Sequence, residues 1–217
     1  MSASPFNRNA TLASKQSALP SRCSAKDVCI VGFGGIGREL VDRLRPFGVH
    51  FIIVDDHPER APSDARAYAG ADLKLAMSSA DYVVLCIPAT PANENLIDAT
   101  TLASMKRGAI FVNVARGTLV DERALTAALK SGHIRAVGLD VLRHEPASIS
   151  DPLVDARHSF ITPHMAGATD LSIEGTVRYV AGAVNAFANG WRWNSLRNDP
   201  PKPRRSLHDH AATAQLV

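Results

Sequence analysis

Short apolar runs alternate with longer amphipathic segments from about residue 26 to residue 190 of the chain. Runs of four to six apolar residues without polar alternation are typical of strands that are buried on both faces of a parallel sheet. We predict such strands at 28–32, 51–55, 82–87, 109–114, 134–139 and 160–161. Apolar residues three or four positions apart predict helices at 35–46, near 72–79, at 100–106, from Asp121 to about Ser131, and at about 169–188. This alternation predicts an α/β fold with a doubly wound parallel sheet of six or seven strands.

The pattern is absent at both ends of the chain. Residues 1–24 contain six serines and three basic residues but no acidic residue, a composition typical of a disordered tail. A transit peptide is the alternative for this segment, although no clear amphipathic helix can be drawn in it. Residues 191–217 are rich in Pro and Arg, and Gly190 is the expected stop of the last helix. We therefore expect one domain at 25–190 between two disordered tails.

Three glycines follow the first predicted strand directly. The sequence Gly-Phe-Gly-Gly-Ile-Gly places Gly32, Gly34 and Gly37 at the spacing of the dinucleotide-binding fingerprint of Rossmann-type folds. In this pattern Gly32 permits a tight turn, Gly34 lets the backbone approach a pyrophosphate, and Gly37 lets the helix pack closely on the strand. The anion is then bound by free N–H groups at the N-terminus of the helix. The segment predicts a dinucleotide site.

A carboxylate follows the second predicted strand. Asp55 comes eighteen residues after Gly37, close to the spacing at which an acidic residue accepts hydrogen bonds from the adenosine ribose hydroxyls. A carboxylate in this place repels a 2'-phosphate, so the sequence favours NAD over NADP. Asp56 competes for the same role, and the nearby Arg60 would favour a phosphate instead.

Composition narrows the class of protein without identifying it. The chain has 217 residues, of which 46% are hydrophobic and 21% charged, as in ordinary globular proteins. It contains no apolar run of membrane-spanning length, and its three cysteines have no disulfide, redox or metal-ligand spacing, so we expect a cytoplasmic protein without a metal. The formal net charge is +3, but the basic excess is concentrated in the tails. We therefore expect neither a nucleic-acid nor a membrane partner.

Ligands of doubly wound sheets bind outside the carboxyl ends of the strands, and several polar residues fall at those ends. Five motifs in order resemble the D-isomer-specific 2-hydroxyacid dehydrogenase family: V-G-F-G-G-I-G, I-P-A-T-P-A-N-E-N-L-I, N-V-A-R-G-T-L-V-D-E-R-A-L, G-L-D-V-L-R-H-E-P and I-T-P-H-M-A-G-A-T. The resemblance covers residues 27 to about 190. It implies an NAD-dependent oxidoreductase that transfers a hydride between the nicotinamide and C2 of a small 2-hydroxy or 2-oxo acid.

The resemblance also assigns roles to individual residues. Arg116, Glu145 and His164 fall on the family's catalytic residues. A histidine suits proton exchange with the substrate oxygen, a carboxylate suits orienting that histidine, and an arginine suits binding the substrate carboxylate. Asp140 falls where the family holds the nicotinamide carboxamide, although an aspartate there could simply cap a turn. The other positions implied to contact the cofactor are Gly32, Gly34, Gly35, Ile36, Gly37, Asp55, Ile87, Pro88, Asn93, Val114, Ala115 and Arg116.

The chain departs from the family in one respect. Complete members carry a second, substrate-binding domain largely ahead of the fingerprint, whereas 31 residues precede Gly32 here. Three hypotheses follow: a dehydrogenase completed by another chain or segment, a non-catalytic NAD-binding module, or a gene fragment. The family also implies a homodimer formed through the nucleotide-binding domain.

Overall fold

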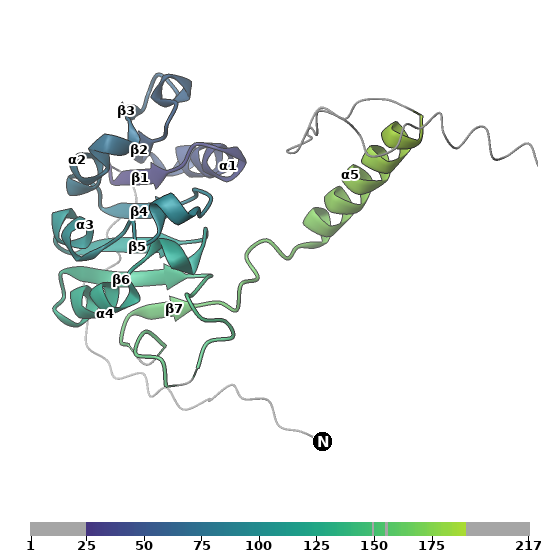
Figure 1. The fold of residues 1–217 in the computed structure, drawn as a ribbon. Helices are drawn as coiled ribbons and strands as arrows, with labels where there is room; N and C mark the ends of the chain where they lie inside the picture. Colours follow the sequence, from purple (N-terminus) through teal and green to yellow (C-terminus); the bar gives the residue numbers. More distant parts are fainter. Residues whose placement is uncertain (1–24, 149, 155, 190–217) are drawn as a thin grey trace, which may run out of the picture. The chain divides into compact units, whose positions relative to one another are not determined.

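Seven parallel strands form one sheet in a computed structural model that describes residues 25–148, 150–154 and 156–189 (Figure 1). The strands are β1 (Asp27–Val31), β2 (His50–Val54), β3 (Arg66–Tyr68), β4 (Tyr82–Leu85), β5 (Ala109–Asn113), β6 (Ile134–Leu139) and β7 (Ser159–Ile161). Their order in the sheet is β3-β2-β1-β4-β5-β6-β7, and every pair is parallel. The predicted Rossmann-type doubly wound sheet is confirmed.

The strand order reverses beside β1, the strand that precedes the glycine fingerprint. β1 pairs with β2 on one side and with β4 on the other, and Cys29 is in register with both Ile52 and Val83. All three of these side chains are fully buried, which explains why the sequence of these strands is apolar without alternation. A reversal of this kind leaves a crevice at the carboxyl ends of the two central strands, where doubly wound folds bind their ligands.

Helices cover the sheet unequally. The α-helices are α1 (Gly35–Leu44), α2 (Leu73–Ser78), α3 (Ala99–Ser104), α4 (Glu122–Lys130) and α5 (Asp170–Ala188), and the 3-10 helices are η1 (Arg45–Phe47), η2 (Pro58–Arg60), η3 (Gly70–Asp72), η4 (Pro91–Asn93) and η5 (Gly117–Leu119). α2, α3 and α4 lie on one face, where Met77, Leu102 and Leu125 are buried in the larger apolar cluster (Figure 1). α1 lies on the other face, where Val41 packs with Ile30 and Ile53.

Two local features differ from the sequence prediction. The first helix was expected to reach residue 46 but ends at Leu44, and the 3-10 helix η1 follows it. Pro46 lacks the N–H group that would continue the α-helical hydrogen bonds, so the chain tightens at this point. The short edge strand β3 was predicted as an irregular polar segment, because its side chains are exposed or half-buried and give no apolar run.

The predicted start of α4 is confirmed in detail. Asp121 is the N-cap, and its carboxylate accepts hydrogen bonds from the N–H groups of Arg123 and Ala124 at 3.0 and 3.1 Å. Gly132, just past the end of the helix, has a φ of 69°.

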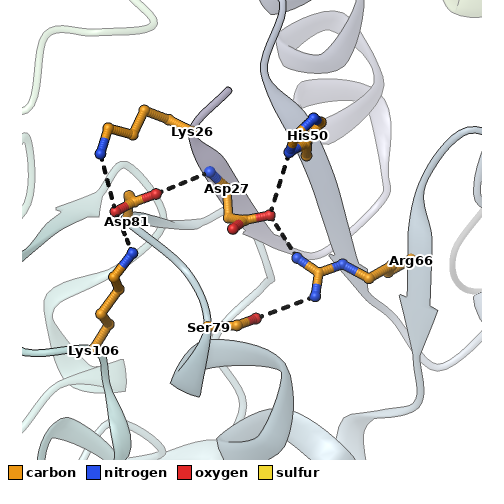
Figure 2. Close-up of polar contacts among 7 residues, drawn as sticks. All are labelled: Lys26, Asp27, His50, Arg66, Ser79, Asp81 and Lys106. Carbon is orange, nitrogen blue, oxygen red and sulfur yellow. Dashed lines mark hydrogen bonds and ion pairs between the residues drawn. The ribbon is translucent and has the colours of Figure 1, made fainter. Parts of the chain in front are cut away.

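The amino ends of the strands are joined by a network of charged side chains (Figure 2). We call this side of the sheet the amino edge. Asp81 accepts hydrogen bonds from Lys106 Nζ at 2.7 Å and from the N–H of Asp27 at 3.1 Å, and Lys26 Nζ lies 3.5 Å from the same carboxylate. Asp27 in turn accepts a hydrogen bond from Arg66 Nη2 at 2.6 Å. Partial burial raises the pKa of the Asp81 carboxyl, but the contacts with Lys106 and Asp27 outweigh it, and the pKa lies below its usual value.

The chain divides into two compact units, a first that ends at Pro163 and a second that begins at His164. The sheet and the helices α1 to α4 belong to the first unit. In the second unit α5 begins with a capping box, in which Thr169 and Ser172 each accept a hydrogen bond from the other's N–H at 3.1 Å. The expected tails at 1–24 and 191–217, and the expected helix stop at Gly190, lie outside the described residues.

Candidate functional site

A cavity of about 550 Å³ lies at the carboxyl ends of β1, β2 and β4, on the side of the sheet that we call the carboxyl edge. This volume is in the range of small-molecule and cofactor sites. The cavity contains six of the residues predicted to contact a cofactor: Gly32, Gly34, Asp55, Ile87, Pro88 and Asn93. It is also lined by Asp56, Cys86 and Thr90, which were not in the predicted set.

The glycine fingerprint forms a close turn beside this cavity. Gly32 has a φ of 101°, its N–H donates to Val54 O at 2.8 Å, and a Cβ at this position would lie 2.9 Å from the carbonyl of Cys86. A Cβ on Gly37 would lie 2.2 Å from Gly32 O, so α1 approaches the strand more closely than a side chain would permit. Only glycine fits at positions 32 and 37 of this turn.

The same turn leaves room for an anion at the start of α1. Gly34 is the N-cap of the helix and lines the cavity, and a Cβ added there would meet no atom within 4 Å. No acidic side chain lies in the first turn of α1. A helix N-terminus that opens onto a cavity presents backbone N–H groups and the positive end of the helix dipole, so the chain fits the pyrophosphate of a dinucleotide here.

Asp55 is fixed at the end of β2 by two backbone groups. Its Oδ2 accepts a hydrogen bond from the N–H of Phe33 at 2.7 Å, and its Oδ1 accepts one from the N–H of His57 at 2.9 Å. Partial burial raises the pKa of the Asp55 carboxyl, but these two hydrogen bonds outweigh it and the pKa lies below its usual value. The fixed carboxylate, with Asp56 also lining the cavity, makes this end of the site negative.

The segment after β4 forms the opposite wall of the cavity. Asn93 closes a capping box, in which its Oδ1 accepts from the N–H of Thr90 at 2.7 Å and the Thr90 side chain accepts from the N–H of Asn93. Asn93 Nδ2 also donates to Pro88 O at 3.0 Å. The side chain of Asn93 therefore orders the turn that carries the other wall residues. Cys86 precedes this turn, and burial raises the pKa of its thiol to about 11.

Arg116 lies on the loop after β5 and is exposed. Its Nη1 donates to Ala115 O at 2.6 Å. The loop is held by Asn113, whose Oδ1 accepts from the N–H of Ala115 at 3.0 Å and whose Nδ2 donates to Arg116 O at 2.9 Å. Asn113 is 1% exposed and was missed by the sequence reasoning, although a polar residue that ends an apolar strand was a usable signal.

Asp140 and Glu145 lie on the loop after β6. Asp140 is 6% exposed, and its Oδ1 accepts a hydrogen bond from Thr162 Oγ1 at 2.5 Å. Glu145 is exposed, and its Oε1 accepts from the N–H of Leu142 at 2.9 Å, so the carboxylate folds back onto its own loop. Both residues follow the carboxyl end of β6, as the position of the motif predicts.

His164 is the first residue of the second unit and has a φ of 52°. The structure thus places Arg116, Asp140 and Glu145 in the first unit with the cavity, and His164 in the other. Four other predicted positions do not line the cavity: Gly35 and Ile36, which directly follow Gly34, and Val114 and Ala115, which follow β5. The assignment of all these residues to a catalytic or cofactor-binding role stays a prediction.

No helix among the described residues is long and apolar enough to cross a membrane. Within the same residues, no group of three or more His, Cys, Asp or Glu side chains is arranged to hold a metal ion.

Comparison with known proteins identifies the lineage of the chain. Residues 4–166 match the model of the D-isomer specific 2-hydroxyacid dehydrogenase NAD binding domain. Over 147 residues, or 66% of the chain, it is 43% identical to a D-3-phosphoglycerate dehydrogenase of Mycobacterium leprae, of which it covers 27%. It is 40% identical over 147 residues, again 66% of the chain, to glyoxylate/hydroxypyruvate reductase B of Salmonella paratyphi B, of which it covers 45%.

Solved structures agree with this result. A D-isomer specific 2-hydroxyacid dehydrogenase of Xanthobacter autotrophicus in complex with NADPH matches 85% of the chain with a TM-score of 0.77 and 29% identity, over 75% of its own length. The NAD-complexed form of the Lactobacillus delbrueckii enzyme matches 83% of the chain with a TM-score of 0.73 and 30% identity, over 58% of its length. The chain thus spans less than half the length of these curated relatives and somewhat more of the solved ones. It belongs to the D-isomer specific 2-hydroxyacid dehydrogenase family and carries the family's NAD binding domain.

Proposed function

We propose that this chain binds NAD at the carboxyl edge and serves hydride transfer between the nicotinamide and C2 of a small 2-hydroxy or 2-oxo acid. One observation carries the proposal: the cavity combines an open helix N-terminus at Gly34 with a fixed carboxylate at Asp55, the two groups that a dinucleotide requires. The pyrophosphate would be bound at the start of α1. The adenosine ribose would donate its hydroxyls to Asp55.

The negative end of the cavity selects between the two nicotinamide cofactors. Asp55 and Asp56 both line it, and a 2'-phosphate would meet their charges at short range. We therefore propose NAD rather than NADP, although some solved relatives were determined with NADPH.

The chemical roles follow from the residue types. When the cofactor is bound, its oxidised form would accept the hydride and its reduced form would donate it. Arg116 binds the substrate carboxylate with its planar fork, His164 exchanges a proton with the oxygen on C2, and Glu145 orients His164 and stabilises its protonated form. Asp140 holds the nicotinamide carboxamide. These are the roles that the family resemblance implies for the four residues.

The proposal is tested by titrating the chain with NADH and NADPH and by following the reduction of glyoxylate or hydroxypyruvate. We expect NADH to bind more tightly than NADPH, and we expect a slow rate that His164→Ala abolishes while NADH affinity stays unchanged. Equal affinity for the two cofactors would contradict the role of Asp55. A rate equal to that of the His164→Ala variant would contradict autonomous catalysis.

A non-catalytic NAD-binding module is the second candidate function. It is favoured by the family match, because the model that the chain matches is that of the NAD binding domain and the cavity with Asp55 lies within the matched residues. This candidate predicts NADH binding without any turnover, so the same two measurements distinguish it from the first.

We further propose a cytoplasmic homodimer, with a folded domain at 25–190 between two tails. The dimer is what the family resemblance implies, since the dimer contact of the family lies on the nucleotide-binding domain. Sedimentation at micromolar concentration should give a dimer, and a monomer would contradict the proposal.

A further inference from the structure

Three loops at the carboxyl edge meet at one arginine. The cofactor loop (residues 86–98) follows β4 and forms a wall of the cavity, the Arg116 loop (residues 114–121) follows β5, and the Glu145 loop (residues 140–148) follows β6. Arg143 lies on the Glu145 loop, between Asp140 and Glu145 in sequence, and its side chain is 25% exposed. Neither the motifs nor the resemblance assigned it a role.

The guanidinium of Arg143 donates to acceptors on both other loops. On the cofactor loop, Nη1 donates to Glu94 Oε1 at 2.9 Å and Nη2 donates to Asn95 Oδ1 at 2.5 Å. On the Arg116 loop, Nη2 donates to the carbonyl oxygens of Thr118 at 3.1 Å and Val120 at 3.3 Å. A planar fork with several donors can span such a set of acceptors, whereas the single ammonium of a lysine cannot.

The backbone of Arg143 is fixed as well. Its N–H donates to Glu122 Oε1 at 2.6 Å, which ties the Glu145 loop to the first turn of α4. A Cβ added at Gly117 would lie 2.0 Å from the carbonyl carbon of Leu142 and 2.3 Å from the nitrogen of Arg143. The residue after Arg116 is therefore in backbone contact with the Glu145 loop, and neither loop can shift without the other.

The cofactor loop joins the same assembly through its backbone. The N–H of Asn95 donates to Thr118 O at 3.0 Å, and the N–H of Ile97 donates to Leu119 O at 2.9 Å. Asn95 has a φ of 53°, a left-handed conformation that asparagine tolerates better than most residues. That conformation and the Oδ1 bond to Arg143 occur at the same residue, two positions after the cavity residue Asn93.

We propose that Arg143 is a positioning residue, which holds the Arg116 loop and the Glu145 loop in place against the wall of the cofactor cavity. The inference rests on the proposed function, because it takes Arg116 and Glu145 to act on the substrate. Arg143 itself does not line the cavity. It sets how the two loops stand relative to a cofactor bound in the cavity, and a displacement of about 1 Å in such loops can lower a rate by about 100-fold.

A purely structural role is the alternative, and Arg66 provides a matched control. Arg66 also binds two partners, Asp27 Oδ1 at 2.6 Å and Ser79 Oγ at 3.4 Å, but it does so at the amino edge (Figure 2). Arg66→Met should lower the free energy of unfolding without changing hydrogen exchange in the Arg116 loop or the Glu145 loop. Arg143→Met and Arg143→Lys should accelerate hydrogen exchange in the Arg116 loop and in the Glu145 loop.

The first test is hydrogen exchange of the full chain without cofactor. In Arg143→Met and in Arg143→Lys we expect amides of residues 114–121 and 140–145 to exchange about tenfold faster, the factor for one lost hydrogen bond of about 1.4 kcal/mol. Asn95→Gly keeps the left-handed backbone and removes the Oδ1 acceptor, so it should accelerate the same amides by a smaller factor. Unchanged exchange in folded Arg143→Met, or an equal change in Arg66→Met, would overturn the proposal.

The second test is the kinetics of glyoxylate reduction with NADH. Arg143→Met should lower kcat/KM for glyoxylate by about 100-fold, mainly through KM, while the NADH dissociation constant changes by less than about threefold. Arg143→Lys should be about as slow as Arg143→Met, because lysine keeps the positive charge but lacks the planar fork of donors. Equal loss of NADH affinity and of kcat/KM would overturn the positioning role. Failure of the wild-type chain to bind NADH would instead contradict the proposed function, and the exchange experiment would still decide the role of Arg143.

Discussion

The two edges of the sheet are held together in different ways. At the amino edge, side chains of opposite charge bind one another, so that Asp81 and Asp27 are met by Lys106, Lys26 and Arg66 (Figure 2). At the carboxyl edge, most side-chain contacts are made with backbone groups, as at Asp55 and Asn93, apart from the contacts of Arg143 with Glu94 and Asn95, and a cavity lies beside them. The amino edge satisfies its own charges, whereas the carboxyl edge leaves donors and acceptors for a ligand.

This difference separates stability from binding. Changes at the amino edge should alter the free energy of unfolding and leave cofactor affinity unchanged. Changes at the residues that line the cavity should alter cofactor affinity, except where the backbone itself is packed too closely to accept a side chain. Four predictions test this separation, from the largest expected effect to the smallest.

The largest effect is expected where α1 packs closely against the turn after β1. In Gly37→Ala the new Cβ would lie 2.2 Å from Gly32 O, so the helix must move away from the strand. We expect the free energy of unfolding to fall by about 3 kcal/mol, as in strongly overpacked sites. Gly35→Ala is the control, since a Cβ there meets no atom within 4 Å. Urea unfolding of both variants measures the difference, and equal stabilities would contradict it.

The second effect concerns the centre of the amino-edge network. Asp81→Ala leaves Lys106 and the N–H of Asp27 without their acceptor, and we expect a loss of about 2 kcal/mol in the free energy of unfolding. Asp64→Ala removes an exposed partner of Arg45, and because exposed ion pairs are screened by water it should cost much less. The separation of the two edges further requires that the NADH dissociation constant of Asp81→Ala equal that of the wild type. A changed constant would show that the edges are coupled.

The third effect concerns cofactor choice at the carboxyl edge. Asp55→Asn keeps an oxygen that can accept from the N–H of Phe33 but removes the negative charge. We expect NADH affinity to fall about tenfold, or about 1.4 kcal/mol, and the preference over NADPH to shrink. Fluorescence titration with both cofactors measures this. An unchanged ratio of the two affinities would assign the selectivity to Asp56 or to another residue of the cavity.

The smallest effect is the pH dependence of the amino edge. The pKa of Asp81 is lowered in the folded chain, so its contribution is complete above the unfolded pKa of about 3.9 and is lost as the pH falls through the folded pKa. The difference in unfolding free energy between wild type and Asp81→Ala should be constant from pH 7 to pH 5 and should decrease below about pH 4. Asp55 has a lowered pKa in both proteins and cancels from the difference. A difference that grows on acidification would contradict the assignment.

The sequence predicted the parts of this molecule that depend on local pattern. Fully buried strands such as β1 and β2 give unbroken apolar runs, and the fingerprint after β1 marks the side on which the cavity lies. The edge strand β3 was missed because it is three residues long and incompletely buried. Its position depends on pairing with β2, which no local pattern records.

The networks at both edges were beyond sequence reasoning for a different reason. Arg66 and Asp27 are 39 residues apart, and Arg143 and Glu94 are 49 residues apart. Each of these charges on its own resembles a solvated surface residue. The partner of each charge is determined by the order of the strands, so these pairs can be identified from the fold but not from the sequence. The candidate catalytic residues, in contrast, were predicted from motifs, and their joint arrangement remains a prediction.

The thiol of Cys86 in the cavity wall has a chemical consequence. Thiolate is the nucleophilic form of cysteine, and a pKa raised by burial to about 11 keeps the thiol protonated near neutral pH. A 2-oxo acid carries an electrophilic carbonyl, to which a thiolate adds. With its thiol protonated, Cys86 is a poor nucleophile toward such a carbonyl and toward peroxide. Cys86 therefore adds no reactive thiolate to the wall of the cavity.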